Sequence, residues 1–368
     1  MLNVMNVADI LVNHIKTNCP DDIAIVAYYG SYAQGTATEH SDLDFFYIPA
    51  TPDGYRQSIA FILEDISFDF WPISWERAEQ MASFDDPKTS VIADSKLLYT
   101  RSEDDRSRFE QLHNKVTTTA QDGLQLLEKS EQELRDTYVH LYKMSRMLPS
   151  DNIAFFRYEA RSVLTKVLYS LARLNQTYVT KGWGKNLEQI YKFKLRPAQL
   201  EKHITTITQS GSCNAVLNAC EELTQETLEL LMKQKETFST PPAYHDRMKG
   251  AYEELKGMLD KIILACDAND YTTAFFWSVE IQELIAMFIY HAEKGYWPIA
   301  LDLSLDYQEL YNNLAFPDLV SYLDPHDLAP LCEAVKRLDA RFESCLKDKG
   351  VKINRFDTLE QFAASFHS

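Results

Sequence analysis

Hydrophobic residues recur at two different spacings along the chain, and the change from one to the other occurs near residue 115. Before that point, β-branched and aromatic runs at 23–29, 45–48 and 66–73 predict buried strands. Apolar positions at helical spacing over 7–17 predict a helix before the first strand. Polar turns separate these runs. An α+β fold is therefore expected, with the strands confined to the first part of the chain.

The remainder of the chain has helical spacing throughout, from about residue 117 onward. One apolar helical face comprises Leu124, Leu127, Leu134, Tyr138, Leu141 and Met144. The segment 237–243 contains Ser-Thr-Pro-Pro and predicts a linker. We therefore expect three domains, at 1–115, 116–238 and 244–368, of which the last two are α-helical bundles.

The two predicted bundles share a short aromatic string. Residues 154–158 read Ala-Phe-Phe-Arg-Tyr and residues 274–278 read Ala-Phe-Phe-Trp-Ser. Each string precedes a long apolar helix and then a Lys-Gly-aromatic loop. The pattern suggests that the second bundle repeats the first, while a chance match of short strings explains it equally well.

Composition limits the classes of protein to which the chain can belong. A net charge of −17 repels nucleic acid and is compatible with a cationic small-molecule substrate. Solubility alone explains this acidity equally well. No run of about 18 apolar residues predicts a membrane span, and the N-terminus does not resemble a signal peptide. Six cysteines without a Cys-x-x-Cys pair indicate reduced thiols. We expect a soluble, cytoplasmic protein with no nucleic-acid or membrane partner.

Candidate chemistry gathers between residues 26 and 48. Gly30-Ser31 follows the first strand, where a glycine lets the backbone approach a phosphate and a helix beginning at Ser31 would present free N–H groups. Asp42 and Asp44 stand two residues apart at the head of the second strand and therefore share a face. Two adjacent carboxylates raise each other's pKa unless a cation separates them. Mg²⁺ is the natural cation for such an all-oxygen pair.

A third carboxylate, Asp69, is the one charge inside the apolar run 66–73. A lone carboxylate in a central strand is costly unless it is paired or coordinated. We therefore take Asp69 as the third member of the acidic cluster, as a metal ligand or a base. The alternative is a buried carboxylate bonded to backbone donors or to an arginine.

Gly30-Ser31, Asp42-Leu43-Asp44 and Asp69 on a later strand together resemble the nucleotidyltransferase fold of the DNA polymerase β superfamily, over about the first 110 residues. The resemblance implies a catalytic domain of mixed β-sheet and helices, followed by one or two helical bundles. It implies that Asp42 and Asp44 hold Mg²⁺, as two ions, while Asp69 holds the second ion or takes a proton. Gly30 and Ser31 would bind the β- and γ-phosphates. An acceptor hydroxyl then attacks the α-phosphorus and pyrophosphate leaves.

The block 159–181 resembles the helical domain of aminoglycoside adenylyltransferases. That resemblance implies that Lys181 contacts the triphosphate; a solvated loop lysine is the equal alternative. Glu159 would serve as an acceptor-site base or as an anchor for a substrate amine. A helix salt bridge between Glu159 and Arg157 or Arg161 is the somewhat stronger interpretation.

One departure from the family pattern concerns the phosphate site. Many small-molecule members carry an arginine after Gly-Ser and another nearby, where this chain has Tyr32 and Gln34. The three carboxylates are unaffected, so we expect a Mg²⁺-dependent nucleotidyltransferase that transfers AMP from ATP, or another nucleoside monophosphate, to a hydroxyl of a small molecule. Aminoglycoside- or lincosamide-like antibiotics are the leading acceptors.

The alternative is a nucleotidyltransferase that AMPylates a partner protein or acts as a regulatory, toxin-neutralising partner. In either case the chain would be a monomer or a homodimer.

Overall fold

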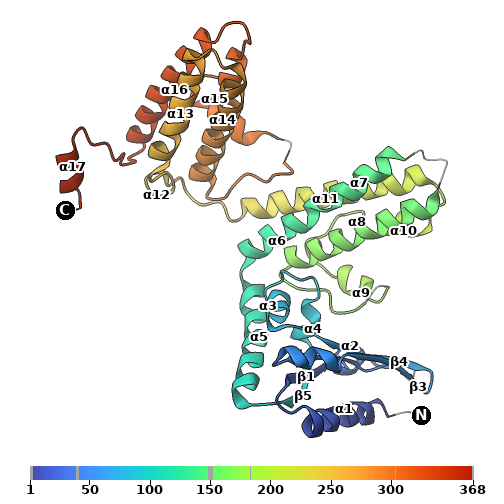
Figure 1. The fold of residues 1–368 in the computed structure, drawn as a ribbon. Coiled ribbons are helices and arrows are strands. Elements are labelled where there is room, and N and C mark those ends of the chain that lie inside the picture. Colours follow the sequence, from blue (N-terminus) through green and yellow to red (C-terminus); the bar gives the residue numbers. More distant parts are fainter. Residues whose placement is uncertain (1–2, 39–40, 148–151, 183, 303, 367–368) are drawn as a thin grey trace. The chain divides into compact units, whose positions relative to one another are not determined.

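The computed structural model describes residues 3–38, 41–147, 152–182, 184–302 and 304–366. The chain folds as two compact units, Met1–Lys235 and Glu236–Ser368 (Figure 1). A mixed sheet lies in the first unit, and helices follow it. The α+β class expected from the hydrophobic pattern is therefore confirmed.

The sheet of the first unit has five strands in the order β3-β4-β2-β1-β5. The strands are β1 (Ile23–Tyr29), β2 (Asp44–Pro49), β3 (Ile59–Leu63), β4 (Ile66–Pro72) and β5 (Lys96–Thr100). β2 and β4 run parallel, and the other neighbours are antiparallel. A short 3-10 helix, η1 (Pro52–Gln57), leads into β3, so the stretch 55–63 contains both a helical turn and a strand.

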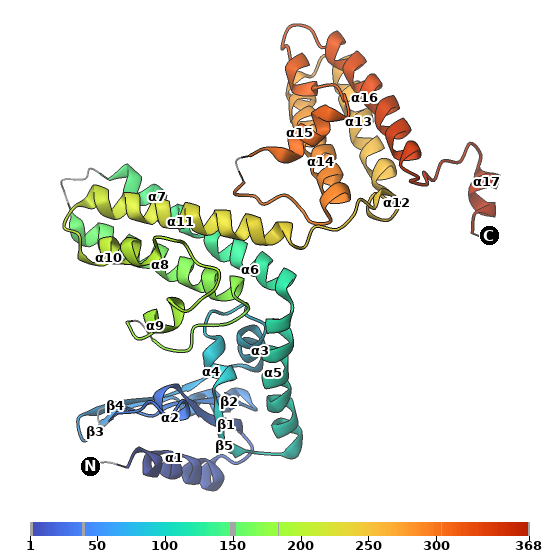
Figure 2. The same cartoon turned by 180° about the vertical axis from the view of Figure 1, so that it is seen from behind.

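Helices cover both faces of this sheet (Figures 1 and 2). On one face α1 (Val4–Asn18) packs against Phe45, Phe68 and Phe70. On the other face Phe46 lies in a core formed with α3 (Trp75–Ala82), α4 (Thr89–Ala93) and α5 (Glu103–Gln121). Successive strand residues alternate between the two cores because strand side chains have a period of two. Ser74 caps α3, since its Oγ accepts from the Arg77 N–H at 3.1 Å.

The first unit continues without interruption into helices. They are α6 (Gly123–Arg135), α7 (Thr137–Arg146), α8 (Ile153–Leu174), α9 (Leu187–Ile190), α10 (Leu200–Gln209) and α11 (Cys213–Glu236). The domain boundary predicted at 115/116 falls inside α5, which packs on β1 and β5 and also meets α6. Because one helix serves both parts, 1–115 and 116–235 form one compact unit.

The second unit is a helical bundle built on α13 (Ala251–Asp267), α14 (Tyr271–Lys294), α15 (Asp306–Asn313) and α16 (Ala329–Asp348). Shorter elements are α12 (Tyr244–Arg247), η2 (Leu319–Tyr322) and α17 (Leu359–Ala364). Among the described residues, α14 alone has the length and hydropathy to cross a membrane. Its Ile281, Ile285 and Ile289 are buried in the core of this bundle.

The proposed repeat of the aromatic string does not extend to packing. Phe156 in the first string is 1% exposed, whereas its counterpart Phe276 is 65% exposed. Ala154 is exposed, whereas its counterpart Ala274 is fully buried. Paired positions therefore face opposite environments, which favours the chance match over a repeated bundle.

Candidate active site

The turn after β1 requires glycine for two reasons. It forms the four-residue helix α2 (Gly30–Ala33), and Gly30 has φ +71°, in the left-handed region that favours glycine. A Cβ placed on Gly30 would also collide with the carboxylate of Asp44. Gly30 thus lets the backbone of the turn lie directly against the first residue of β2.

Replacing Gly30 by alanine is therefore expected to destabilise the protein and to displace Asp44. Gly35→Ala is a matched control, because Gly35 has φ +70° but a Cβ placed on it would meet no atom of the described residues within 4 Å. Both variants should lose about 1–2 kcal/mol of unfolding free energy from backbone strain. Only Gly30→Ala should lose most of the enzymatic activity that the sequence leads us to expect as well. Equal activities in the two variants would contradict this account.

The three predicted carboxylates lie around the start of the central strand β2, but they do not share one environment. Asp44 is the first residue of β2, and Asp42 lies in the loop just before it. Phe45 pairs with Phe70 across the parallel strands, so one step back along the register Asp44 stands beside Asp69. Asp69 is exposed. This exposure contradicts the alternative of a buried carboxylate bonded to backbone donors or to an arginine: Phe68 and Phe70 face the α1 core, while Asp69 points to the opposite side of the strand.

Asp44 is the carboxylate most perturbed by this arrangement. Burial, and after it the charge of Asp42, raises its pKa to about 6. The neighbouring Tyr29 hydroxyl has its pKa raised to about 12, mainly by burial and next by Asp44, with smaller effects of Asp69 and Asp42. All three carboxylates are thus close enough to influence one hydroxyl.

The donor set fits a hard divalent cation held by two carboxylates. Throughout the described ranges, no group of three or more Asp, Glu, His or Cys side chains is assembled to hold one ion. The metal-ligand role of Asp42, Asp44 and Asp69 together therefore stays a prediction. Mg²⁺ usually binds one or two protein carboxylates and completes its shell with substrate phosphates and water. The half-buried pair of Asp42 and Asp44, which repel each other, meets that requirement.

A cavity of about 400 Å³ opens beside Asp44 within the first unit. Its walls come from the glycine turn, β2, the loop before α4, α8 and the loop after α8. The lining residues are Tyr29, Gly30, Ser31, Gln34, Thr36, Asp44, Pro87, Lys88, Ser90, Val91, Tyr169, Val179, Thr180, Lys181, Gly182 and Lys185. The predicted phosphate-site residues Gly30, Ser31 and Lys181 are thus brought together with Asp44.

Three lysines, Lys88, Lys181 and Lys185, line this cavity. In the part of the chain that the structure describes, none of them forms an ion pair. Unneutralised cations grouped in a chain of net charge −17 indicate a site for an anion. Sequence reasoning missed Lys88 and Lys185. Lys185 had a local signal, its place four residues after Lys181 in a glycine-containing loop, whereas Lys88 had none.

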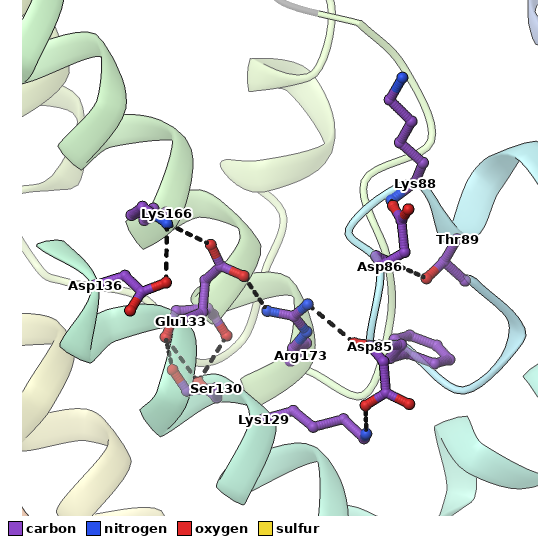
Figure 3. Close-up of polar contacts among 12 residues, drawn as sticks. Asp85, Asp86, Lys88, Thr89, Lys129, Ser130, Glu133, Asp136, Lys166 and Arg173 are labelled. Carbon is purple, nitrogen blue, oxygen red and sulfur yellow. Dashed lines mark hydrogen bonds and ion pairs between the residues drawn. The ribbon is translucent and has the colours of Figure 1, made fainter. Parts of the chain in front are cut away.

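The loop that carries Lys88 is held by ionic contacts with the helices (Figure 3). Arg173 of α8 is almost fully buried and donates to the Phe84 carbonyl at 3.0 Å and to Glu133 Oε2 at 2.7 Å. Lys129 of α6 pairs with Asp85 (Figure 3). Within the loop, Asp86 Oδ1 accepts from the Lys88 N–H at 2.8 Å. These contacts fix the backbone on which Lys88 stands.

Glu159 lies outside this cavity. Its carboxylate accepts from His140 Nδ1 at 2.6 Å and pairs with Lys143 Nζ at 3.4 Å. Burial opposes ionisation, but these two hydrogen bonds outweigh it and hold the pKa of Glu159 below its usual range. The structure therefore does not bring Glu159 to the candidate site. Its ionic partners come from α7, not from Arg157 or Arg161 on its own helix.

A comparison with protein-family models agrees with a nucleotide-transferring site. Residues 106–237 match the family model described as the KNTase C-terminal domain, that of kanamycin nucleotidyltransferase. This match supports a nucleotidyltransferase enzyme, a class that uses a nucleoside triphosphate and generally a divalent metal. No curated protein matches the chain.

Ten chains of solved structures also match. One is the crystal structure of a nucleotidyltransferase-like protein from Exiguobacterium sibiricum 255-15, with 14% sequence identity and a TM-score of 0.33. The alignment covers 75% of this chain and 91% of that chain.

Proposed function

We propose that the protein is a Mg²⁺-dependent nucleotidyltransferase that transfers a nucleoside monophosphate, in the first place AMP from ATP, to a hydroxyl of a small molecule. The observation that carries the proposal is the cavity in the first unit, which brings Asp44 together with Lys88, Lys181 and Lys185. A nucleoside triphosphate carries negative charge and its bound metal carries positive charge, and the walls of the cavity have groups that complement both. Its phosphates fit the three lysines, and its Mg²⁺ fits the carboxylate pair.

Each residue has a defined part in this proposal. Asp42 and Asp44 would hold Mg²⁺, which supplies charge neutralisation of the phosphates when bound. Lys181 and Lys185 bind phosphate oxygens, and Ser31 orients them from the glycine turn. The acceptor oxygen forms a new bond to the α-phosphorus, the bond to pyrophosphate breaks, and Asp69 accepts the proton of the hydroxyl. The exposure of Asp69 suits a group that meets an incoming acceptor.

The acceptor we propose is a cationic, hydroxyl-rich small molecule such as an aminoglycoside. The net charge of −17 favours the approach of a cation. The description of the matching family model, which names kanamycin nucleotidyltransferase, supports the same class.

The decisive experiment incubates the purified chain with Mg²⁺, one of four labelled nucleoside triphosphates, and either an aminoglycoside and lincosamide panel or a cell lysate. We expect label in a small molecule only when Mg²⁺ is present, and none with Asp42→Asn. Label that enters protein instead would favour the AMPylating alternative. Undiminished turnover in Asp42→Asn, or no transfer from any triphosphate, would refute the proposal.

Lys181→Ala is expected to raise the KM for the triphosphate about 10- to 100-fold, because it removes a charge-assisted hydrogen bond worth about 1.5–3 kcal/mol. The change should weaken with added salt, since it is electrostatic. Steady-state kinetics at two ionic strengths measures it. Lys202→Ala is the control, because Lys202 is an exposed lysine of α10 whose ammonium donates to Gln199, outside the cavity. A KM unchanged in Lys181→Ala would remove this lysine from the phosphate site.

A further inference from the structure

We propose that Gln34 is a positioning residue that holds the Lys181 loop against the glycine turn; the inference rests on the proposed binding of a nucleoside triphosphate. Gln34 immediately follows α2, so it belongs to the same short segment as Gly30 and Ser31. Its Nε2 donates to the Thr180 carbonyl at 2.6 Å and to Asp94 Oδ2 at 2.8 Å. One amide group thereby joins three segments far apart in the sequence.

Asp94 extends the connection to a second point of the same loop. It is the C-cap residue of α4, and its other oxygen, Oδ1, accepts from the Tyr178 hydroxyl at 2.8 Å. The Asp94 carboxylate therefore contacts both Gln34 and Tyr178. Since both partners donate, the three groups lock into one arrangement.

Gln189 of α9 holds the loop from the opposite side. Its Oε1 accepts from the Thr180 N–H at 3.0 Å and from the Thr180 hydroxyl at 3.1 Å. Its Nε2 donates to the Tyr178 carbonyl at 2.8 Å. Together with Gln34, this glutamine engages the backbone on both sides of the buried Val179, two residues before Lys181.

The consequence is a lysine whose backbone is already in place before a ligand arrives. A long, flexible lysine side chain costs entropy when it is immobilised, and a mobile loop beneath it would add to that cost. Because the Gln34 contacts already order the loop, ligand binding does not have to order it. The same contacts set the spacing between Ser31 and Lys181 across the cavity. Gln34 thus acts on the ligand through Lys181, although it also lines the cavity.

A double-mutant cycle tests this coupling in the full-length chain. Binding of a non-hydrolysable ATP analogue with Mg²⁺ is measured by calorimetry for the wild type, Gln34→Ala, Lys181→Ala and the double variant. We expect Gln34→Ala alone to weaken binding about 5- to 10-fold, the effect of losing two hydrogen bonds. In the Lys181→Ala background the same change should have less than about a 2-fold effect.

Two further variants separate positioning from a general loss of structure. Gln282→Ala is the matched control, because Gln282 joins Asp318 at 2.9 Å and the Val320 N–H at 3.3 Å in the second unit. It should leave analogue binding unchanged. Tyr178→Phe removes only the hydroxyl bond to Asp94, and we expect it to weaken binding about 2- to 5-fold. It keeps the test open if Gln34→Ala fails to fold.

The outcomes distinguish this inference from the proposed function. Additive effects of Gln34→Ala and Lys181→Ala, or normal binding by both Gln34→Ala and Tyr178→Phe, would overturn the positioning role while the wild type still bound nucleotide. A wild type that bound no triphosphate analogue would overturn the proposed function itself, and the inference with it.

Discussion

Replacing Asp44 by asparagine is expected to reduce nucleotide transfer at least about 1000-fold and, at the same time, to stabilise the metal-free protein. The activity loss follows from removing one of two carboxylates that would hold the ion, whose charge stabilisation is worth several kcal/mol in a transition state. The gain in stability follows from the strain of keeping Asp44 ionised, half-buried and beside Asp42.

The pH dependence of this stability has a defined sign. Folding raises the pKa of Asp44 from 3.8 to about 6, so the folded state holds its proton more tightly than the unfolded state. The ionised group therefore opposes folding, and stability is lost as pH rises through this window. Asp44→Asn should unfold at a higher temperature than the wild type above about pH 6, with the difference vanishing toward about pH 4.

Added Mg²⁺ should reverse the order of the unfolding temperatures of the wild type and Asp44→Asn. At about pH 8 the ion should raise the unfolding temperature of the wild type, because it binds an ionised pair, and at about pH 5 it should do so much less. The unfolding temperature of Asp44→Asn should change little with Mg²⁺ at either pH. Thermal scans with and without Mg²⁺ measure this, and Asp65→Asn, an exposed change in the β3–β4 turn, is the control. An Asp44→Asn variant that kept its turnover, or was less stable than the metal-free wild type near pH 8, would contradict the assignment.

Removal of Arg173 is expected to cause a large loss of stability. Its side chain is 7% exposed and binds both Glu133 and the Phe84 carbonyl (Figure 3). Arg173→Ala leaves a largely buried carboxylate and a carbonyl without this partner, a change that typically costs about 3–5 kcal/mol. Arg108→Ala is the matched control, since the Arg108–Glu79 pair is half-exposed and such pairs contribute at most about 1 kcal/mol. Urea unfolding compares the two variants.

Arg173→Ala should also loosen the candidate active site. Because Phe84 and Asp85 precede Pro87 and Lys88, loss of the Arg173 contact should loosen the loop that lines the cavity. Faster hydrogen exchange over 84–91 and weaker binding of the triphosphate would show this. Arg173→Lys keeps the charge but lacks the planar guanidinium that donates to two acceptors at once, so it should restore only part of the binding. If Arg173→Ala were as mild as Arg108→Ala, the ionic contacts would not position the loop.

The sequence by itself determined the local structure and the identity of the chemical groups. The strand at 23–29 and the change to helical spacing follow from hydrophobic periods that act over a few residues. Gly30-Ser31 and the pair Asp42 and Asp44 were recognisable as one candidate site because the turn and the next strand lie close in the sequence. Such signals are local, so no tertiary information was needed to find them.

Only the tertiary structure decided which distant groups share the cavity. Lys88 reaches it because Arg173 and Lys129, on helices α8 and α6, hold its loop, and Gln34 meets Thr180 across 146 positions. The packing also placed Glu159 with α7 and left Asp69 exposed, although the sequence pattern had offered other partners or surroundings for each carboxylate. The physical reason is that periodicity tells which side of a strand or helix a residue occupies, whereas its partner depends on how separate elements pack.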